Sequence, residues 1–248
     1  MPPPKKVPQT DAIFAHLSQV HRQAGADATV VRLSLDSKAA VVLGPFARGG
    51  SSRTGIRAVD HDFKPLGKLT PFGIFWLGAK ELSLYFTATK VSSDFMVDRL
   101  AEWWQRHGSG LRGVRRLLLD LDNGPENHGY RSQFLYRLVC LAQAEQLAIE
   151  LAYYPPYHSK YNPIERCWSS LEKKWNGVLL TCWEVVRACA LRMTWRRKHP
   201  VVERLERTYS AKVKVSKGEM KDVNARLERS ATLPKYDITI KPRKPRGR

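Results

Sequence analysis

The chain has 248 residues, with 42 Lys and Arg against 23 Asp and Glu and a formal net charge of +19. Hydrophobic residues account for 43% of the chain and include seven Trp, so we expect a folded globular protein and exclude wholesale disorder. No apolar run approaches the roughly 18 residues that a membrane helix needs, and the N-terminal segment lacks the apolar stretch of a secretory signal. We therefore expect no membrane partner.

The chain begins with an arm, residues 1–25, in which we expect one short helix. Two strands follow, the first over the alternating sequence TVVRLSLD that ends at Asp36, and the second over AAVVLG. The next segment, GPFARGGSSRTG, is a glycine-rich loop. No Gly-Lys-Ser/Thr follows it, so we exclude a nucleoside-triphosphate site there. Two further strands, FGIFWLG and ELSLYFTAT, are expected to join near Gly78.

Helices and strands alternate through the middle of the chain. Ser93 is predicted to cap a helix whose apolar residues, Met96, Leu100, Trp103 and Trp104, have helical spacing. The apolar run RRLLLDLD is typical of a central strand, and a long helix is expected over residues 130–146. The sequence LAIELAYYPP then predicts another strand, which ends at its two prolines.

Two more helices are predicted after these strands. Asn162 is in position to cap the first, with Pro163 at its first residue. Its apolar stripe has the spacing i, i+4, i+7 and i+11, and consists of Ile164, Trp168, Leu171 and Trp175. Thr181 is predicted to cap the second helix, which runs through the Val185–Trp195 region. The order of elements indicates an α/β fold with a mixed sheet and helices packed on its faces.

The positive charge is concentrated toward the C-terminus. Residues 186–248 hold 19 basic and 6 acidic residues, about 13 of the 19 net charges. A polyanionic partner is favoured because each phosphate that Lys or Arg neutralises releases condensed counterions. Nucleic acid is favoured over a membrane surface, since no helix pairs a basic face with a large apolar one. A solvated basic surface with a disordered tail is the alternative.

The four cysteines are at positions 140, 167, 182 and 189 and form no CxxC pair. Their spacing also lacks the framework that disulfide-rich secreted proteins show. We interpret them as reduced and mostly buried thiols of a cytosolic protein.

Three carboxylates occupy unusual positions. Asp36 and Asp122 each end a predicted strand, and Glu165 lies in the first turn of an apolar helix. Ligands of open α/β sheets gather outside the carboxyl ends of strands, and Mg²⁺ prefers a few carboxylates together with water and substrate phosphate. In a strongly basic protein this pattern indicates metal-assisted phosphoryl transfer on nucleic acid.

Each carboxylate also has a simpler interpretation. Asp36 could end a strand and begin a turn, and Asp122 followed by Asn-Gly is favourable turn chemistry. Asp120 lies two residues earlier on the same strand face and could be the ligand instead. Glu165 stands three residues after Asn162, from where a Glu can reach back to its own helix cap. Composition and spacing leave these alternatives open.

Several segments together resemble a known family. The stretches LDNGPENHGYRSQFLYRL and YYPPYHSKYNPIERCWSSLEKKWNG are similar to the catalytic core of bacterial insertion-sequence DDE transposases. The segments LSLDSKAAVVLGPFARGGSSR, DHDFKPLGKLTPFGIF, KVSKGEM and LPKYDITIKP resemble the ISAzo-type group in particular. The resemblance extends over nearly the whole chain from about residue 8.

This resemblance implies an RNase H-like fold in which the first and fourth strands are adjacent. Asp36, Asp122 and Glu165, separated by 86 and 43 residues, then become the catalytic and metal-binding triad. The implied cofactor is Mg²⁺ or Mn²⁺, and the implied reaction is hydrolytic cleavage at transposon ends followed by attack of the freed 3′-hydroxyl on target DNA. Insertion-sequence ends and target DNA are the implied partners, along with a possible homo-oligomer, in the bacterial cytoplasm at the nucleoid.

The expected organisation is an arm over 1–25, the RNase H-like catalytic domain over 26–200 and a basic extension over 201–248. Only about 25 residues precede the first strand, too few for the helix-turn-helix region of such transposases. A truncated DNA-binding remnant without catalysis is therefore the alternative function.

Other residues near the motifs are candidates for supporting roles. Asn123 and His158 are candidates to orient the site or contact phosphate, with a turn residue and a surface group as the alternatives. The candidates for contact with the DNA backbone are Lys160, Arg166, Arg196, Arg197 and Lys198. A solvated basic face explains these five equally well.

Overall fold

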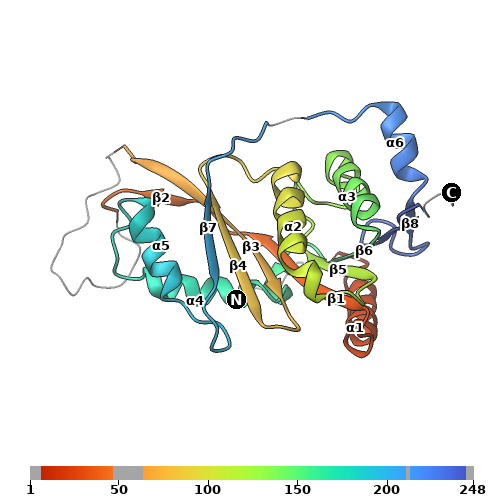
Figure 1. Cartoon of the computed structure of the whole chain (residues 1–248), viewed down its shortest axis with the longest axis horizontal. Coiled ribbons are helices and arrows are strands. Elements are labelled where there is room, and N and C mark those ends of the chain that lie inside the picture. The colour runs from red at the N-terminus through yellow and green to blue at the C-terminus, as the bar shows by residue number, and fades with distance from the viewer. Residues whose placement is uncertain (1–6, 47–63, 211–212, 244–248) are drawn as a thin grey trace. The chain divides into compact units, whose positions relative to one another are not determined.

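The computed structural model describes residues 7–46, 64–210 and 213–243 (Figure 1). The chain forms two compact units whose segments alternate along the sequence. The first unit comprises Met1–Leu35, Ser92–Asn162 and Tyr209–Arg248, and the second comprises Asp36–Val91 and Pro163–Thr208. Asp122 therefore belongs to the first unit, whereas Asp36 and Glu165 belong to the second.

The first unit contains a mixed sheet. Strand β1 (Val30–Ser37) enters it with residues 30–35 and pairs in parallel with β5 (Arg116–Leu121), which pairs in parallel with β6 (Ala148–Tyr153). Strand β9 (Asp237–Ile240) is antiparallel to β6, and β8 (Leu227–Arg229) is antiparallel to β9. The apolar run of β5 is almost completely buried, as its sequence predicts.

Helices pack on this sheet and on one another. They are α1 (Thr10–Ala26), α2 (Ser93–His107), α3 (Ser132–Glu145) and α6 (Lys217–Asn224), with short 3₁₀ turns η1 (Gly108–Gly110) and η2 (Ser159–Tyr161). The expected short N-terminal helix is in fact 17 residues long, because Ile13, Leu17 and Val20 give it a continuous buried face. Helices α2 and α3 lie side by side (Figure 1).

The second unit contains β2 (Val41–Leu43), β3 (Gly67–Trp76), β4 (Glu81–Thr87) and β7 (Val201–Leu205), with helices α4 (Glu165–Trp175) and α5 (Trp183–Leu191). Strand β3 is antiparallel to β2 and β4, and β7 is parallel to β4. The predicted stripe Ile164, Trp168, Leu171 and Trp175 is buried in the core of this unit.

The predicted α/β class, with mixed sheets and flanking helices, is confirmed. The pairing of β1 with β5 also confirms the expected adjacency of the first strand and the strand that precedes Asp122. The glycine-rich loop spans residues 44–55, and most of it, residues 47–55, lies outside the described residues. All four cysteines are free, but only Cys167 and Cys189 are buried, and Cys140 is exposed. No helix among the described residues is long and apolar enough to cross a membrane.

Three predicted helix caps are wrong. Ser92, not Ser93, caps α2, since its hydroxyl accepts a hydrogen bond from the Phe95 N–H. Helix α5 begins after Cys182 rather than Thr181, and it ends at Leu191 because residues 195–198 form a tight turn. Asn162 does not cap α4 either, because Ile164 is the N-cap of that helix. The Asn162 side chain instead bonds strand β1, donating to the Leu35 carbonyl at 3.1 Å and accepting from the Ser34 hydroxyl.

Candidate active site

Asp36 is the penultimate residue of β1, and its side chain is 6% exposed. The indole N–H of Trp168 donates to its Oδ2 at 2.8 Å, and the Ser37 backbone N–H donates to its Oδ1 at 2.7 Å. The structure therefore fixes the orientation of a buried carboxylate at the end of the strand, where the sequence places a ligand.

Glu165 is brought to the same neighbourhood by the helix that carries Trp168. It is the first residue of α4, three residues before Trp168, so the two side chains lie on one face of the helix. The bond from Trp168 to Asp36 thus ties the first turn of α4 to the end of β1. The alternative in which Glu165 reaches back to a cap at Asn162 does not hold, since the N-cap of α4 is Ile164 and Glu165 is the first residue of the helix.

A glycine in β3 makes room for Trp168. A Cβ at Gly73 would lie 2.6 Å from Ile164 Cδ1 and 2.9 Å from Trp168 Cη2. Both distances are far below van der Waals contact, so only glycine lets α4 approach the strand this closely. The sequence offers no signal for this role, because Gly73 stands within an ordinary apolar strand pattern.

Asp122 follows β5 in the other unit and begins the turn that its Asn-Gly sequence predicts. Its Oδ1 accepts from the Gly124 N–H at 3.1 Å and from Asn127 Nδ2 at 2.8 Å. Asn123 has a left-handed backbone, with φ of 63°, and its side-chain Oδ1 is buried without a hydrogen-bond partner among the described residues. Asn127 is in turn held by the Tyr153 hydroxyl, which donates to its carbonyl at 2.7 Å. Burial raises the pKa of Tyr153, so this hydroxyl stays a donor.

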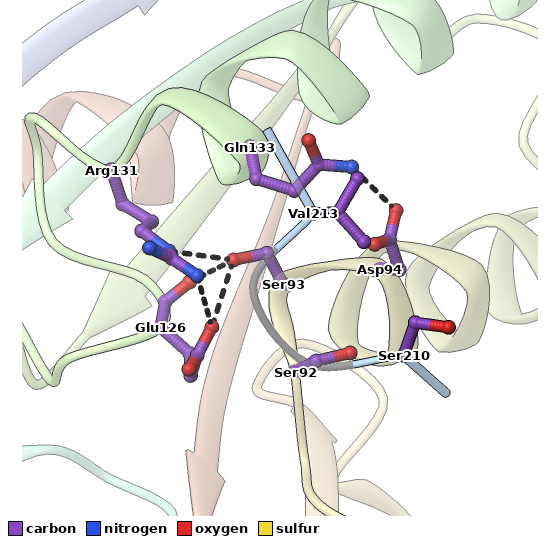
Figure 2. Close-up of a pocket in the computed structure, with 8 residues that line it drawn as sticks. All are labelled: Ser92, Ser93, Asp94, Glu126, Arg131, Gln133, Ser210 and Val213. Atoms are coloured by element: carbon purple, nitrogen blue, oxygen red, sulfur yellow. Dashed lines mark hydrogen bonds and ion pairs between the residues drawn. The ribbon is translucent and has the colours of Figure 1, made fainter. Parts of the chain in front are cut away.

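A polar network supports the other end of this loop (Figure 2). Ser93, at the start of α2, donates to the Glu126 carbonyl at 2.7 Å, and Arg131 pairs with the Glu126 carboxylate at 3.0 Å. Next to this pair, Gln133 of α3 donates a hydrogen bond to the carboxylate of Asp94 of α2 at 2.9 Å. The segment from Asp122 to Arg131 is therefore attached at several points to the helices of its own unit.

Asp120 is engaged elsewhere. Its side chain is fully buried, with Oδ1 2.8 Å from His21 Nε2 and Oδ2 2.7 Å from Arg32 Nη2. Arg32 Nε also donates to Oδ2 at 2.9 Å. Both oxygens are thus occupied by side chains of α1 and β1, which argues against the alternative that Asp120 replaces Asp122 as a ligand.

We predict that Asp120→Asn destabilises the protein by about 3 kcal/mol, because it leaves Arg32 in a partly buried site without its counter-charge. Urea unfolding would measure the change. The matched control is Glu228→Gln, which removes an exposed ion pair with Lys241 and should alter stability by less than about 1 kcal/mol. A ligand role for Asp120 would instead show as lost catalysis with little change in stability.

Strands β1 and β5 pair in parallel, with Ser34 beside Asp120. Within residues 7–46, 64–210 and 213–243, no group of three His, Cys, Asp or Glu side chains lies close enough together to hold a metal ion.

The sequence as a whole was compared with known protein families. Residues 2–242 match the family described as the Rhodopirellula transposase DDE domain. The chain belongs to this family. The resemblance to ISAzo-type DDE transposases is thereby confirmed.

Solved transposase structures are similar to the chain at low identity. One is a crystal structure of the Mos1 mariner paired end complex with Mn, with a TM-score of 0.49 and 12% identity over 75% of this chain. Another is the Mos1 transposase paired-end complex with left transposon end, with a TM-score of 0.48 and 12% identity. The chain spans 55% of the length of each of these structures. No curated protein sequence matches it.

The basic candidates of this transposase domain are accessible. Lys160 is exposed with its Nζ 5.3 Å from the Tyr161 ring, and Arg166 is exposed on α4. Arg196, Arg197 and Lys198 are exposed in the tight turn before β7. Their contact with DNA stays a prediction.

His158 is not a surface group, contrary to the alternative considered for it. The side chain is 3% exposed and its Nδ1 lies 2.8 Å from the Pro156 carbonyl. Its ring also packs on Tyr161 and edge-on against Phe14. These contacts account for the residue through packing alone.

Proposed function

We propose that this transposase domain cleaves and joins DNA strands in a reaction that depends on Mg²⁺ or Mn²⁺, with Asp36, Asp122 and Glu165 as its catalytic carboxylates. The observation that carries the proposal is the hydrogen bond from Trp168 to Asp36. It fixes a buried carboxylate at a strand end and ties to it the helix that begins with Glu165.

The donor chemistry of these residues fits a divalent cation. Among the described residues, both donors to Asp122 meet its Oδ1, so that Oδ2 is left for another ligand. The neighbouring Asn123 Oδ1 is a buried oxygen without a donor, and such an atom is stabilised by a cation. Asp36, Asp122 and Glu165 would hold the ion, which when bound polarises a phosphate oxygen and lowers the pKa of water.

The protein itself contributes orientation and charge. Ser37 and Trp168 hold the Asp36 carboxylate, and Gly124 and Asn127 hold that of Asp122, so neither has to reorganise as charge develops on the phosphate. Burial raises the pKa of the Cys167 thiol, two residues after Glu165, to about 12. This thiol stays protonated at neutral pH and is a poor nucleophile, consistent with attack by water rather than by a protein group.

Nicking of supercoiled plasmid tests the proposal directly. We expect purified protein to convert supercoiled DNA to the open-circle form with Mg²⁺ or Mn²⁺, and not with a chelator or with Asp122→Asn. The control Asp27→Asn changes an aspartate that is bonded to Thr29 in a surface turn and should cut like the wild type. DNA binding without nicking under any metal would overturn the proposal and favour the truncated DNA-binding remnant.

A further inference from the structure

A two-residue turn of unusual sequence precedes β7. The Trp195 N–H donates to the Lys198 carbonyl at 2.8 Å, and the Lys198 N–H donates back to Trp195 at 2.9 Å. The two central residues have positive φ, 50° at Arg196 and 67° at Arg197. This is the geometry of a type I′ turn, for which Asn-Gly is strongly preferred, because a side chain with a Cβ is disfavoured in the left-handed region.

The arginine side chains gain little from packing that would offset this strain. Both are exposed, and the closest described contact is the Arg196 guanidinium, 5.8 Å from the centre of the Trp195 ring. The Trp195 ring itself is anchored edge-on against Phe75 of β3 at 6.2 Å. The strained turn is thus fixed to the sheet, and its two arginines project from it. Strain that packing does not explain points to a function.

The charge around the turn is entirely positive. Residues 185–202 include five Arg and Lys and no Asp or Glu. Across the part of the chain that the structure describes, no ion pair joins Arg196, Arg197 or Lys198 to a carboxylate. Three consecutive cations on a fixed turn are complementary in charge to a phosphate backbone.

Strand register places the turn far from Asp36 within the second unit. Lys38, two residues after Asp36, donates from its backbone to Pro71 of β3. Pro71 is paired with Phe86 of β4, and Phe86 with Arg204 of β7. The turn ends at Lys198, six residues before Arg204 and three before β7 begins, so it lies beyond the start of β7.

We propose that the turn formed by Arg196 and Arg197 binds the phosphate backbone of duplex DNA, away from the phosphate on which Asp36 acts. The inference rests on the proposed function and assigns it a second DNA contact, separate from Asp36. The turn retains arginines in place of Asn-Gly because these cations are required for binding, at the expense of backbone stability.

The double substitution Arg196→Asn with Arg197→Gly tests the proposed DNA contact, because it should raise thermal stability and lower DNA affinity. It supplies the preferred type I′ sequence, so we expect Tm to rise by about 2–4 °C. It removes two phosphate contacts, so affinity for a 30-base-pair duplex should fall about tenfold, and the slope of log K against log salt should shrink by about 1.8. Cleavage of DNA at saturating concentration should be unchanged, because neither arginine is one of the proposed catalytic residues.

Two controls separate this contact from a general effect of net charge. Arg112→Asn with Arg115→Gln removes two exposed cations next to β5 and should leave the salt slope unchanged. Arg196→Lys with Arg197→Lys keeps the charge and should keep the slope. The inference would be overturned if the first control and the turn variant lost the same DNA affinity. It would also be overturned if the salt slope of the turn variant did not change. Failure of the wild type to bind duplex DNA would instead contradict the proposed function.

Discussion

Glu165→Gln is expected to lower the rate of metal-dependent DNA cleavage by about 10³-fold or more while leaving the fold intact. If Glu165 is a metal ligand, its loss removes part of a charge stabilisation that amounts to several kcal/mol, and each 1.36 kcal/mol is a factor of ten in rate. Stability should change by less than about 1 kcal/mol, because the residue is half-buried at the start of α4 and caps no helix end. Plasmid nicking and urea unfolding of the same preparation would measure both.

The control lies on the same helix. Glu172→Gln removes an equally conservative charge two turns later, where Glu172 pairs with Lys38 at 3.0 Å. We expect this variant to cleave DNA at the wild-type rate, with a small loss of stability. A Glu165 that only supports the start of the helix would give a different pattern, in which Glu165→Gln lowers stability and keeps cleavage. That result would remove Glu165 from the proposed site.

Six of the nine strands among the described residues were predictable because their signals are local, whereas β7, β8 and β9 were not predicted. The alternation before Asp36 and the apolar run before Asp122 each predict a strand, and both strands form as expected. The turn at Asp122 follows from Asn-Gly chemistry, and the positive φ of Asn123 is its direct expression. The apolar stripe of α4 is predictable for the same reason, since its spacing alone defines a buried face.

The contacts that orient the carboxylates were not predictable, because they join residues far apart in sequence. The helical spacing of Trp168 predicts a core residue, and Trp168 is buried in the core. Its indole N–H also donates to the carboxylate of Asp36, which lies 132 residues earlier in the sequence. The sequence predicts Asn162 as a helix cap. Its side chain instead forms hydrogen bonds with Ser34 and Leu35 of β1, which lie 128 and 127 residues earlier. Local propensity decides where helices and strands form, whereas tertiary hydrogen bonds decide which polar residues orient the site.

Trp168→Phe should lower the affinity of the protein for Mn²⁺ by about 10–100-fold, the range expected when a group that orients a metal ligand is lost. Phenylalanine keeps most of the buried ring but removes the N–H that donates to Asp36, so the carboxylate loses a fixed orientation and a buried hydrogen bond. Calorimetric titration with Mn²⁺ measures the affinity directly. Cleavage at low metal should fall in parallel and recover as the metal concentration is raised, because the ligand itself is still present.

Trp104→Phe is the matched control for the same chemical change. Trp104 also donates from its indole N–H to a carboxylate, that of Glu145 at 3.0 Å, and this pair lies outside the candidate site. Trp104→Phe should lower stability about as much as Trp168→Phe does, but its affinity for Mn²⁺ should equal that of the wild type. Equal Mn²⁺ affinities in the wild type and Trp168→Phe would show that Trp168 is a core residue alone.

Gly73→Ala is expected to disturb the hydrogen bond from Trp168 to Asp36 without changing the polar atoms of either residue. The added methyl would lie 2.6 Å from Ile164 and 2.9 Å from Trp168, so α4 or the indole must move. Overpacking of this kind destabilises a core by about 1–3 kcal/mol. If the Trp168 bond orients Asp36, the same substitution must also weaken Mn²⁺ binding in protein that is still folded. Gly110→Ala, at an open position, should change neither. A loss of stability without a loss of Mn²⁺ affinity would separate the packing of α4 from the orientation of Asp36.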